Sequence, residues 1–206
     1  MTELQIAFIV TASLAGLLLL FIVFYKPIKR ALLARNFVRN YGRMIYKVAL
    51  DYDYYLINQF GLAKDGDSIT TINHILFGQK YIYVIKDCYY RGAISAKEND
   101  ASWIHYVNKN KKRYIDNPLR VNASNLHKLF LITRIEKNML ISIVVVNDDC
   151  HIEPFERKSQ SNFLVTKSHF RKLIQALEQR SVENIDDQAL DRAVKDIAHL
   201  NLNRHK

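Results

Sequence analysis

The chain contains few cysteines, prolines and glycines. Its 206 residues include 2 cysteines, 3 prolines and 6 glycines. Cys88 and Cys150 stand far apart and do not make a disulfide framework, so we expect both to be buried or idle thiols. The histidines are scattered, with no helical pair of the zinc-protease type and no Cys-x-x-Cys motif. The sequence therefore predicts no zinc site.

Several catalytic and nucleotide-binding signatures are also missing. The sequence contains no Walker loop, no G-x-S-x-G elbow and no dinucleotide-binding fingerprint. It shows no internal repeat and no low-complexity linker, and its length suits one ordinary domain with a short addition. We expect one α/β domain attached to an N-terminal segment of a different kind.

Acidic residues are outnumbered. The chain has 30 lysines and arginines against 20 aspartates and glutamates, a formal net charge of +10. A basic balance of this size favours nucleic acid or anionic lipid as a partner, but it does not indicate a fold.

The N-terminal segment is a long apolar run. No charged residue occurs from Leu4 to Tyr25, which is enough to cross the ~30 Å hydrocarbon layer of a membrane. A cleaved signal peptide would need a basic n-region and a small-residue cleavage site. The chain instead begins Met1-Thr2-Glu3, and the run ends in Phe24, Tyr25 and Lys26. The sequence predicts an uncleaved transmembrane anchor over residues 1–26.

A basic segment follows the anchor, and no acidic residue occurs between the anchor and Asp51. Its cations are Lys26, Lys29, Arg30, Arg35, Arg39, Arg43 and Lys47. Because basic flanks stay on the cytoplasmic side, we expect a single-pass protein of the cell membrane with its N-terminus outside. These cations should also attract anionic lipid headgroups, at about 1 kcal/mol per charge close to the surface.

Local patterns predict the elements of the rest of the chain. Pro27 is expected to end the anchor, and a basic juxtamembrane helix is expected over residues 27–50. The segments Ser68–Phe77 and Tyr81–Cys88 have the signature of a β-hairpin. Ile141–Val146 has the profile of a central buried strand.

Four further segments complete the expected domain over residues 51–206. The basic stretch Asn108–Arg113 is expected to be a loop, and Asn117-Pro118 to open a helix. Ser168 is expected to cap a helix over Phe170–Leu177. The last expected helix is amphipathic, with one apolar stripe of Leu190, Val194 and Ile197.

Five short strings occur in an order typical of one family. They are Gly42-Arg43, Ile72-Asn73-His74, the run from Val84 to Gly92 (VIKDCYYRG), Trp103, and the run from Asn117 to Asn122 (NPLRVN). Together, over about residues 40–170, they resemble the NERD (nuclease-related) family. Its members carry Gly-Glu, Ile-Asp-His, Val-Ile-Glu-x-Lys-x-Tyr-x-Gly, Trp and Asn-Pro-x-x-Gln-Asn. The resemblance implies a restriction-endonuclease-like α/β core, with a central mixed sheet flanked by helices.

The catalytic positions that the resemblance implies are all substituted. Arg43 stands at the acidic helix residue, Asn73 at the metal-binding Asp, Lys86 at the Glu, Cys88 at the Lys and Val121 at the helix Gln. A nuclease of this kind holds Mg²⁺ with carboxylates. A cation in their place, at ~4 Å and an effective dielectric near 20, costs about 4 kcal/mol. We therefore expect no metal, no cofactor and no nuclease activity.

Nearby residues are not expected to restore the site. The neighbouring carboxylates are Asp65, Asp67, Asp87, Glu98 and Asp100. Asp87 should face away from Lys86 and Cys88, because successive strand residues alternate between faces. Asp65 and Asp67 suit a glycine-containing turn. Arg43, Lys86 and His74 could instead form an anion pocket, although we prefer local pairing or exposure to solvent for these cations.

Two functions stay open, with an active nuclease as a less favoured third. The first is a membrane-tethered, non-catalytic module that docks a membrane or cytoplasmic protein partner at the cytoplasmic membrane face. The second is nucleic-acid binding without cleavage, for which Lys109, Lys111, Lys112 and Arg113 lie near aromatic residues in the sequence: Trp103, Tyr106 and Tyr114. A solvated basic loop explains the same stretch, and we prefer it.

Overall fold

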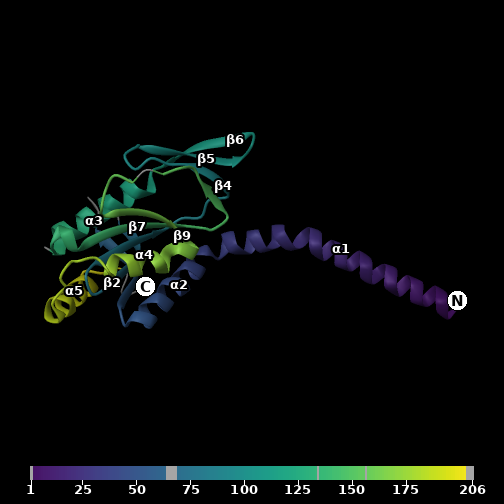
Figure 1. The fold of residues 1–206 in the computed structure, drawn as a ribbon, viewed down its shortest axis with the longest axis horizontal. Coiled ribbons are helices and arrows are strands. Elements are labelled where there is room, and N and C mark those ends of the chain that lie inside the picture. The colour runs from purple at the N-terminus through teal and green to yellow at the C-terminus, as the bar shows by residue number, and fades with distance from the viewer. Residues whose placement is uncertain (1, 64–68, 134, 156, 203–206) are drawn as a thin grey trace. The chain divides into compact units, whose positions relative to one another are not determined.

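The computed structural model describes residues 2–63, 69–133, 135–155 and 157–202. The chain divides into two units, residues 1–40 and 41–206. The second unit is a compact α/β fold that contains every described strand (Figure 1).

The first unit is dominated by one helix, α1 (Glu3–Arg35). Within it, Thr11–Arg35 is long and apolar enough to cross a membrane, as judged by length and composition. The prediction that Pro27 ends this helix is wrong, because Pro27 lies inside it and the break comes at Asn36. Proline removes one backbone N–H donor, but the turns on both sides continue the helix.

The helix α2 (Phe37–Tyr52) leads into the compact unit. Its buried side chains, Tyr41, Ile45, Val48 and Ala49, recur at helical spacing and form one apolar stripe. The helix is followed by Asp53 with φ of 55°, a left-handed conformation that often ends helices. The Tyr54 N–H then donates to the Ala49 carbonyl at 2.8 Å.

The larger sheet has five strands in the order β1-β2-β3-β7-β9. The strands are β1 (Tyr55–Ala63), β2 (Ile69–Phe77), β3 (Ile82–Asp87), β7 (Leu140–Val146) and β9 (Asn162–Thr166). β1, β2 and β3 pair antiparallel, whereas β3, β7 and β9 pair parallel. The predicted hairpin and the predicted central strand are both confirmed, since every residue of β7 is buried.

The smaller sheet has four strands in the order β6-β5-β4-β8. They are β4 (Gly92–Ser95), β5 (Ser102–Asn108), β6 (Lys111–Asp116) and β8 (Cys150–Ile152). The predicted loop over Asn108–Arg113 is wrong, because Lys111 to Arg113 belong to β6 and pair with β5. The hairpin supplies partners for these backbone groups, which local polarity alone did not indicate.

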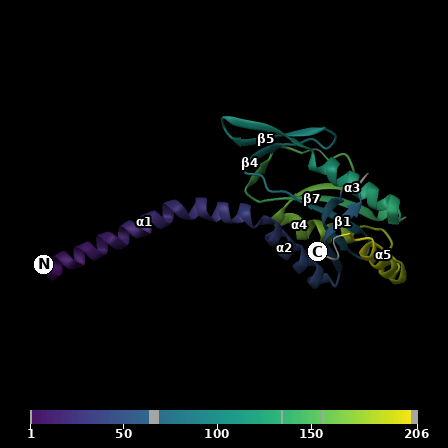
Figure 2. The ribbon, with the colours of Figure 1, turned by 180° about the vertical axis from the view of Figure 1, so that it is seen from behind.

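Helices cover both faces of the larger sheet. α3 (Pro118–Thr133) packs on one face, where Leu126 and Leu129 meet Ile75 and Val84. α2 and α4 (Phe170–Glu178) lie on the other face, and the two views agree (Figures 1 and 2). A mixed sheet between helices is the α/β architecture expected from the sequence.

Capping decides where the helices begin. α3 opens as predicted, since the Asn117 side-chain oxygen accepts from the Leu119 N–H at 2.9 Å and proline follows at the first helical position. The predicted cap at Ser168 is wrong. Ser168 lies in a 3₁₀ turn, η2 (Lys167–His169), and its own N–H donates to Asp148 at 2.8 Å.

Two apolar clusters fill the compact unit. The first lies between the larger sheet, α3 and α5 (Asp187–His199), whose buried Ile197 confirms the predicted amphipathic helix. The second joins the two sheets and contains Trp103, Cys88 and Cys150. Both cysteines are free and buried, as predicted. At about 1.5–3 kcal/mol for each fully buried large apolar side chain, these clusters hold the fold together.

Candidate functional site

The motif residues of β2 and β3 gather at one end of their ladder. His74 pairs with Ile85, and Ile75 pairs with Val84. The regular pairing ends there, one residue before Asn73 of β2 and Lys86 of β3. Lys86 is two residues after Val84 and shares the face that α3 covers. Alternation is broken around Asn73, because Ile72 and Ile75 both pack into the cluster on that face, and Gln59 of the neighbouring strand has φ of 52°. The side chains of Asn73 and Lys86 are both half-buried.

Cys88 follows Lys86 on the same face. Its side chain is 7% exposed and belongs to the apolar cluster between the sheets. Burial raises the pKa of the Cys88 thiol, and this effect outweighs the lowering by the Tyr90 hydrogen bond and the Lys86 cation. A thiol with a raised pKa stays protonated at neutral pH and is a poor nucleophile.

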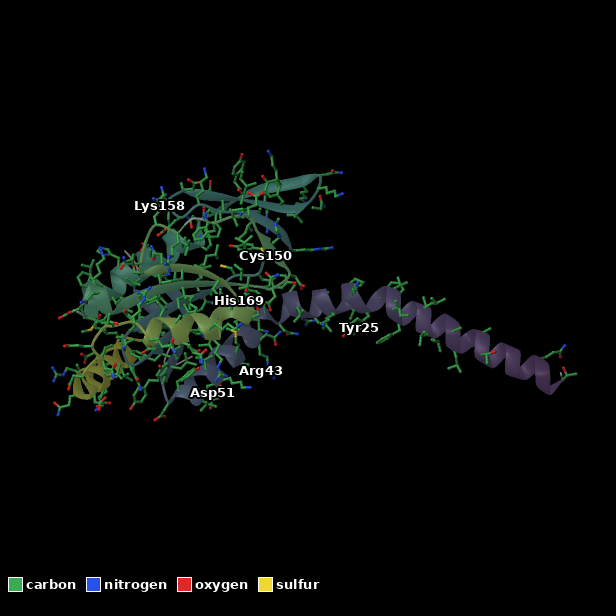
Figure 3. The ribbon with its side chains drawn as sticks, in the orientation of Figure 1. Tyr25, Arg43, Asp51, Cys150, Lys158 and His169 are labelled. Carbon is green, nitrogen blue, oxygen red and sulfur yellow. The ribbon has the colours of Figure 1, made fainter. Side chains whose placement is uncertain are left out.

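The two remaining substituted positions lie on helices. Arg43 is exposed on α2, the helix that also carries Asp51 (Figure 3). Val121 is 37% exposed in the first turns of α3. Since α2 and α3 cover opposite faces of the larger sheet, the structure does not bring these two positions together.

His74 takes part in a buried polar chain on the face of α2. Its Nε2 atom lies 2.7 Å from Asp87 Oδ2, and its Nδ1 atom lies 2.6 Å from Asn58 Oδ1. His74 is 2% exposed and Asp87 is 7% exposed. Gly42 of α2 lies directly over the ring, because a Cβ added there would be 3.6 Å from His74 Cε1.

The pairing of His74 with Asp87 could have been predicted from strand spacing, although the family motifs do not indicate it. Asp87 is two residues beyond Ile85, the direct partner of His74, so the two side chains are diagonal neighbours on one face. The same alternation separates His74 from Lys86. The structure therefore does not gather Arg43, Lys86 and His74 into one pocket.

Tyr41 of α2 lies next to these hydrogen-bonded polar residues. Its hydroxyl donates to the Cys88 carbonyl oxygen at 3.2 Å. Burial, with the Asp87 carboxylate as the next contribution, raises the pKa of Tyr41 well above its ordinary value. The hydroxyl is therefore a donor and not a base at neutral pH.

Of the other neighbouring carboxylates, Glu98 has a structural role. Glu98 is 6% exposed, and its Oε2 atom accepts from the backbone N–H groups of Lys158 at 2.6 Å and Ser159 at 3.0 Å. Burial favours the neutral acid, but these donors and the Asn162 amide outweigh it and hold the pKa of Glu98 below its ordinary value. Asp65 and Asp67 lie outside the described residues.

Among the described residues, no group of three or more His, Cys, Asp and Glu side chains is arranged to hold a metal ion. Asn73, Lys86 and Cys88 offer one amide, one cation and one protonated thiol. Hard divalent cations prefer anionic oxygen ligands, and these three side chains supply none.

The predicted nucleic-acid patch divides in the structure. Trp103 is 1% exposed, and its indole N–H donates to the Lys97 carbonyl at 2.9 Å, so it cannot stack on a base. Tyr114 is 69% exposed on β6, and Lys109, Lys111 and Lys112 are exposed beside it. Arg113 is tied by an Nε–H donation to His105 Nδ1 at 3.1 Å.

Residues 39–147, more than half of the chain, match the family model described as the nuclease-related domain, NERD. No curated protein and no solved structure matches the chain. The match covers the strings from Gly42 to Asn122 on which the resemblance was based.

Removing one partner of the His74–Asp87 pair should strongly destabilise the fold. We expect His74→Ala or Asp87→Ala alone to lower the free energy of unfolding by about 3–5 kcal/mol, because each leaves a buried polar group unpaired. The double variant should cost less than the sum of the two by about 1–3 kcal/mol. Urea unfolding measures all three, and the exposed pair Arg171–Asp51 is a control whose coupling should be much smaller, because water screens it. Additive losses at His74 and Asp87 would contradict this account.

The stabilisation by Glu98 should depend on pH. Its folded pKa lies below the unfolded value, so its contribution is present above the unfolded pKa and is lost as pH falls through the folded pKa. We expect Glu98→Gln to cost about 1–3 kcal/mol at pH 7 and progressively less below pH ~4.3. Thermal unfolding of both proteins between pH 7 and pH 3 measures the difference. If the difference in stability between the two proteins stays constant over this pH range, the charge of Glu98 does not stabilise the fold.

Proposed function

We propose that this chain, which belongs to the nuclease-related domain (NERD) family, is a membrane-anchored member that no longer cleaves nucleic acid and acts as an interaction module at the cytoplasmic membrane face. The observation that carries the proposal is the pair of substitutions at Asn73 of β2 and Lys86 of the neighbouring strand β3. At these two positions the family resemblance implies carboxylates, and this chain has an amide and an ammonium group.

Electrostatics supports the loss of the reaction. A divalent cation between these two strands would lie within a few ångströms of the Lys86 ammonium group. At ~4 Å and an effective dielectric near 20, each pair of like unit charges costs about 4 kcal/mol. Of the neighbouring carboxylates that the structure describes, Asp87 is paired with His74 on the other face and Glu98 is bound by backbone donors.

Side-chain hydrogen bonds hold α3 to the rest of the compact unit. Asn122 Nδ2 donates to the Val84 carbonyl at 2.8 Å and to Ser142 Oγ at 2.9 Å, so α3 is joined to β3 and β7 by direct hydrogen bonds. Asn117 Nδ2 similarly donates to the carbonyls of Glu98 at 2.9 Å and Asp100 at 2.7 Å. Direct hydrogen bonds of this kind between a helix and the sheet suit a scaffold that binds a partner.

Anchoring supports a role at the membrane. The apolar segment of α1 has the length to span a bilayer, and the cations that follow it favour retention of the following chain in the cytoplasm. A binding module held in this way meets membrane proteins and cytoplasmic proteins close to the membrane. We infer that the partner is a protein of one of these two classes.

Metal binding is tested by restoring the two carboxylates. We expect the unchanged protein to give no saturable heat with Mn²⁺ in titration calorimetry and no cleavage of single- or double-stranded substrates. The double variant Asn73→Asp, Lys86→Glu should bind Mn²⁺, because it exchanges a cation for two anionic ligands. A control with the same charge change on the exposed turn η1 (Lys137–Met139), Asn138→Asp with Lys137→Glu, should not. Metal-dependent cleavage by the unchanged protein would end the proposal of inactivity.

Anchoring and partnership are tested in native membranes. We expect the full chain to stay with the membrane in alkaline carbonate, to dissolve in mild detergent, and to co-purify with defined membrane or cytoplasmic proteins.

Orientation is tested by labelling. An impermeant maleimide should label a Thr2→Cys variant in intact cells and a Ser181→Cys variant only after permeabilisation. A detergent-solubilised monomer without partners, or release by carbonate, would contradict the proposal.

A further inference from the structure

The hairpin of β5 and β6 ends in an exposed cluster of lysines. Lys109 lies in the turn, and Lys111 and Lys112 begin β6. The described residues form three side-chain ion pairs, and none of them involves these lysines. Their charge is therefore not neutralised by carboxylates of the described fold. We call Lys109, Lys111 and Lys112 the lysine tip.

Apolar and aromatic side chains continue from the tip along one face. Tyr106 pairs with Lys112, and Ile104 pairs with Tyr114, so these four residues share the outer face of the smaller sheet. The opposite face carries Trp103 and Ile94, which pack into the core. The outer face thus combines cations at the tip with Tyr114, which is 69% exposed.

Protection of a sheet edge explains only part of this surface. β6 is an edge strand, and lysines on edge strands discourage pairing with other chains. That role accounts for the lysines but not for an exposed tyrosine beside them. Tyrosine next to lysine is instead typical of the membrane–water interface, where an amphipathic ring lies among headgroups.

The distribution of charge along the β5–β6 hairpin favours a planar anionic surface over a nucleic-acid strand as the partner. The tip is cationic, whereas Asp116 at the other end of β6 is exposed and pairs with Ser102. A nucleic-acid strand following β6 would meet this carboxylate, and such strands need a positive groove along several phosphates. A planar anionic surface touches the tip alone and avoids Asp116.

We propose that the lysine tip, with Tyr106 and Tyr114, docks the compact unit onto anionic phospholipid headgroups. This inference rests on the proposed function only in taking α1 as the membrane anchor. An anchored unit is held near the bilayer at high effective concentration, so weak contacts are sufficient to orient it. Three lysines near an anionic surface each strengthen the contact about fivefold.

The test uses the full chain in nanodiscs of phosphatidylcholine alone or with 30% phosphatidylserine, and measures amide hydrogen exchange. We expect residues 108–116 to exchange several-fold more slowly with phosphatidylserine, and the difference to shrink at high salt. The triple variant Lys109→Gln, Lys111→Gln, Lys112→Gln should lose the difference. A control that removes three exposed charges elsewhere, Lys137→Gln, Lys172→Gln and Arg192→Gln, should retain it. Unchanged exchange in β7 shows that each variant is folded.

Other outcomes are informative in different ways. Equal exchange of residues 108–116 in both lipid compositions would overturn the docking proposal. So would protection by single-stranded DNA, added to phosphatidylcholine nanodiscs at 150 mM salt, without protection by phosphatidylserine, since the tip would then be a nucleic-acid surface. Failure of α1 to insert appears separately, as chain that is not recovered with the nanodiscs. That result refutes the anchor of the proposed function and not the surface chemistry of the tip.

Discussion

Successive side chains of β3 point to opposite faces of the larger sheet, and the arrangement of polar groups depends on this alternation. Tyr83, Ile85 and Asp87 face α2 and α4, whereas Val84 and Lys86 face α3. β3 is paired on both sides, with β2 and β7, so its register cannot shift by one residue without exposing the core. The separation between the His74–Asp87 pair and Lys86 is therefore fixed.

This separation gives the two faces different roles. On one face, His74 is hydrogen-bonded to Asp87 and Asn58, and its ring packs against Gly42 of α2. On the other face, Lys86 stands at a position where the family resemblance places a metal ligand. A buried carboxylate, Asp87, is thus present one residue from Lys86 but is held on the opposite face.

Asparagine side chains connect the parts of the compact unit. Asn122 joins α3 to β3 and β7, and Asn117 joins the start of α3 to the segment around Glu98. Both side chains are 1% exposed, so each hydrogen bond satisfies groups that water does not reach. The asparagines of the family string from Asn117 to Asn122 therefore have a structural explanation that holds whether or not the chain is an enzyme.

Local sequence determined the elements whose patterns are strong. The apolar run of α1, the hairpin of β2 and β3, the buried strand β7 and the opening of α3 at Asn117 all follow from period, propensity and capping. These features depend on neighbours a few residues away, which is the range that a sequence pattern reports. The family was likewise evident from short strings in a fixed order, and the match over residues 39–147 agrees with it.

Tertiary structure alone decided which of these residues meet. Lys111 to Arg113 became a strand because β5 offers partners, and Trp103 was buried because the two sheets share a core. Pro27 remained inside a helix because the turns around it outweigh one lost hydrogen bond. The pairing of His74 with Asp87 required the register of two strands and the cover of α2. Such contacts join residues distant in sequence, and their energies depend on burial that no local pattern specifies.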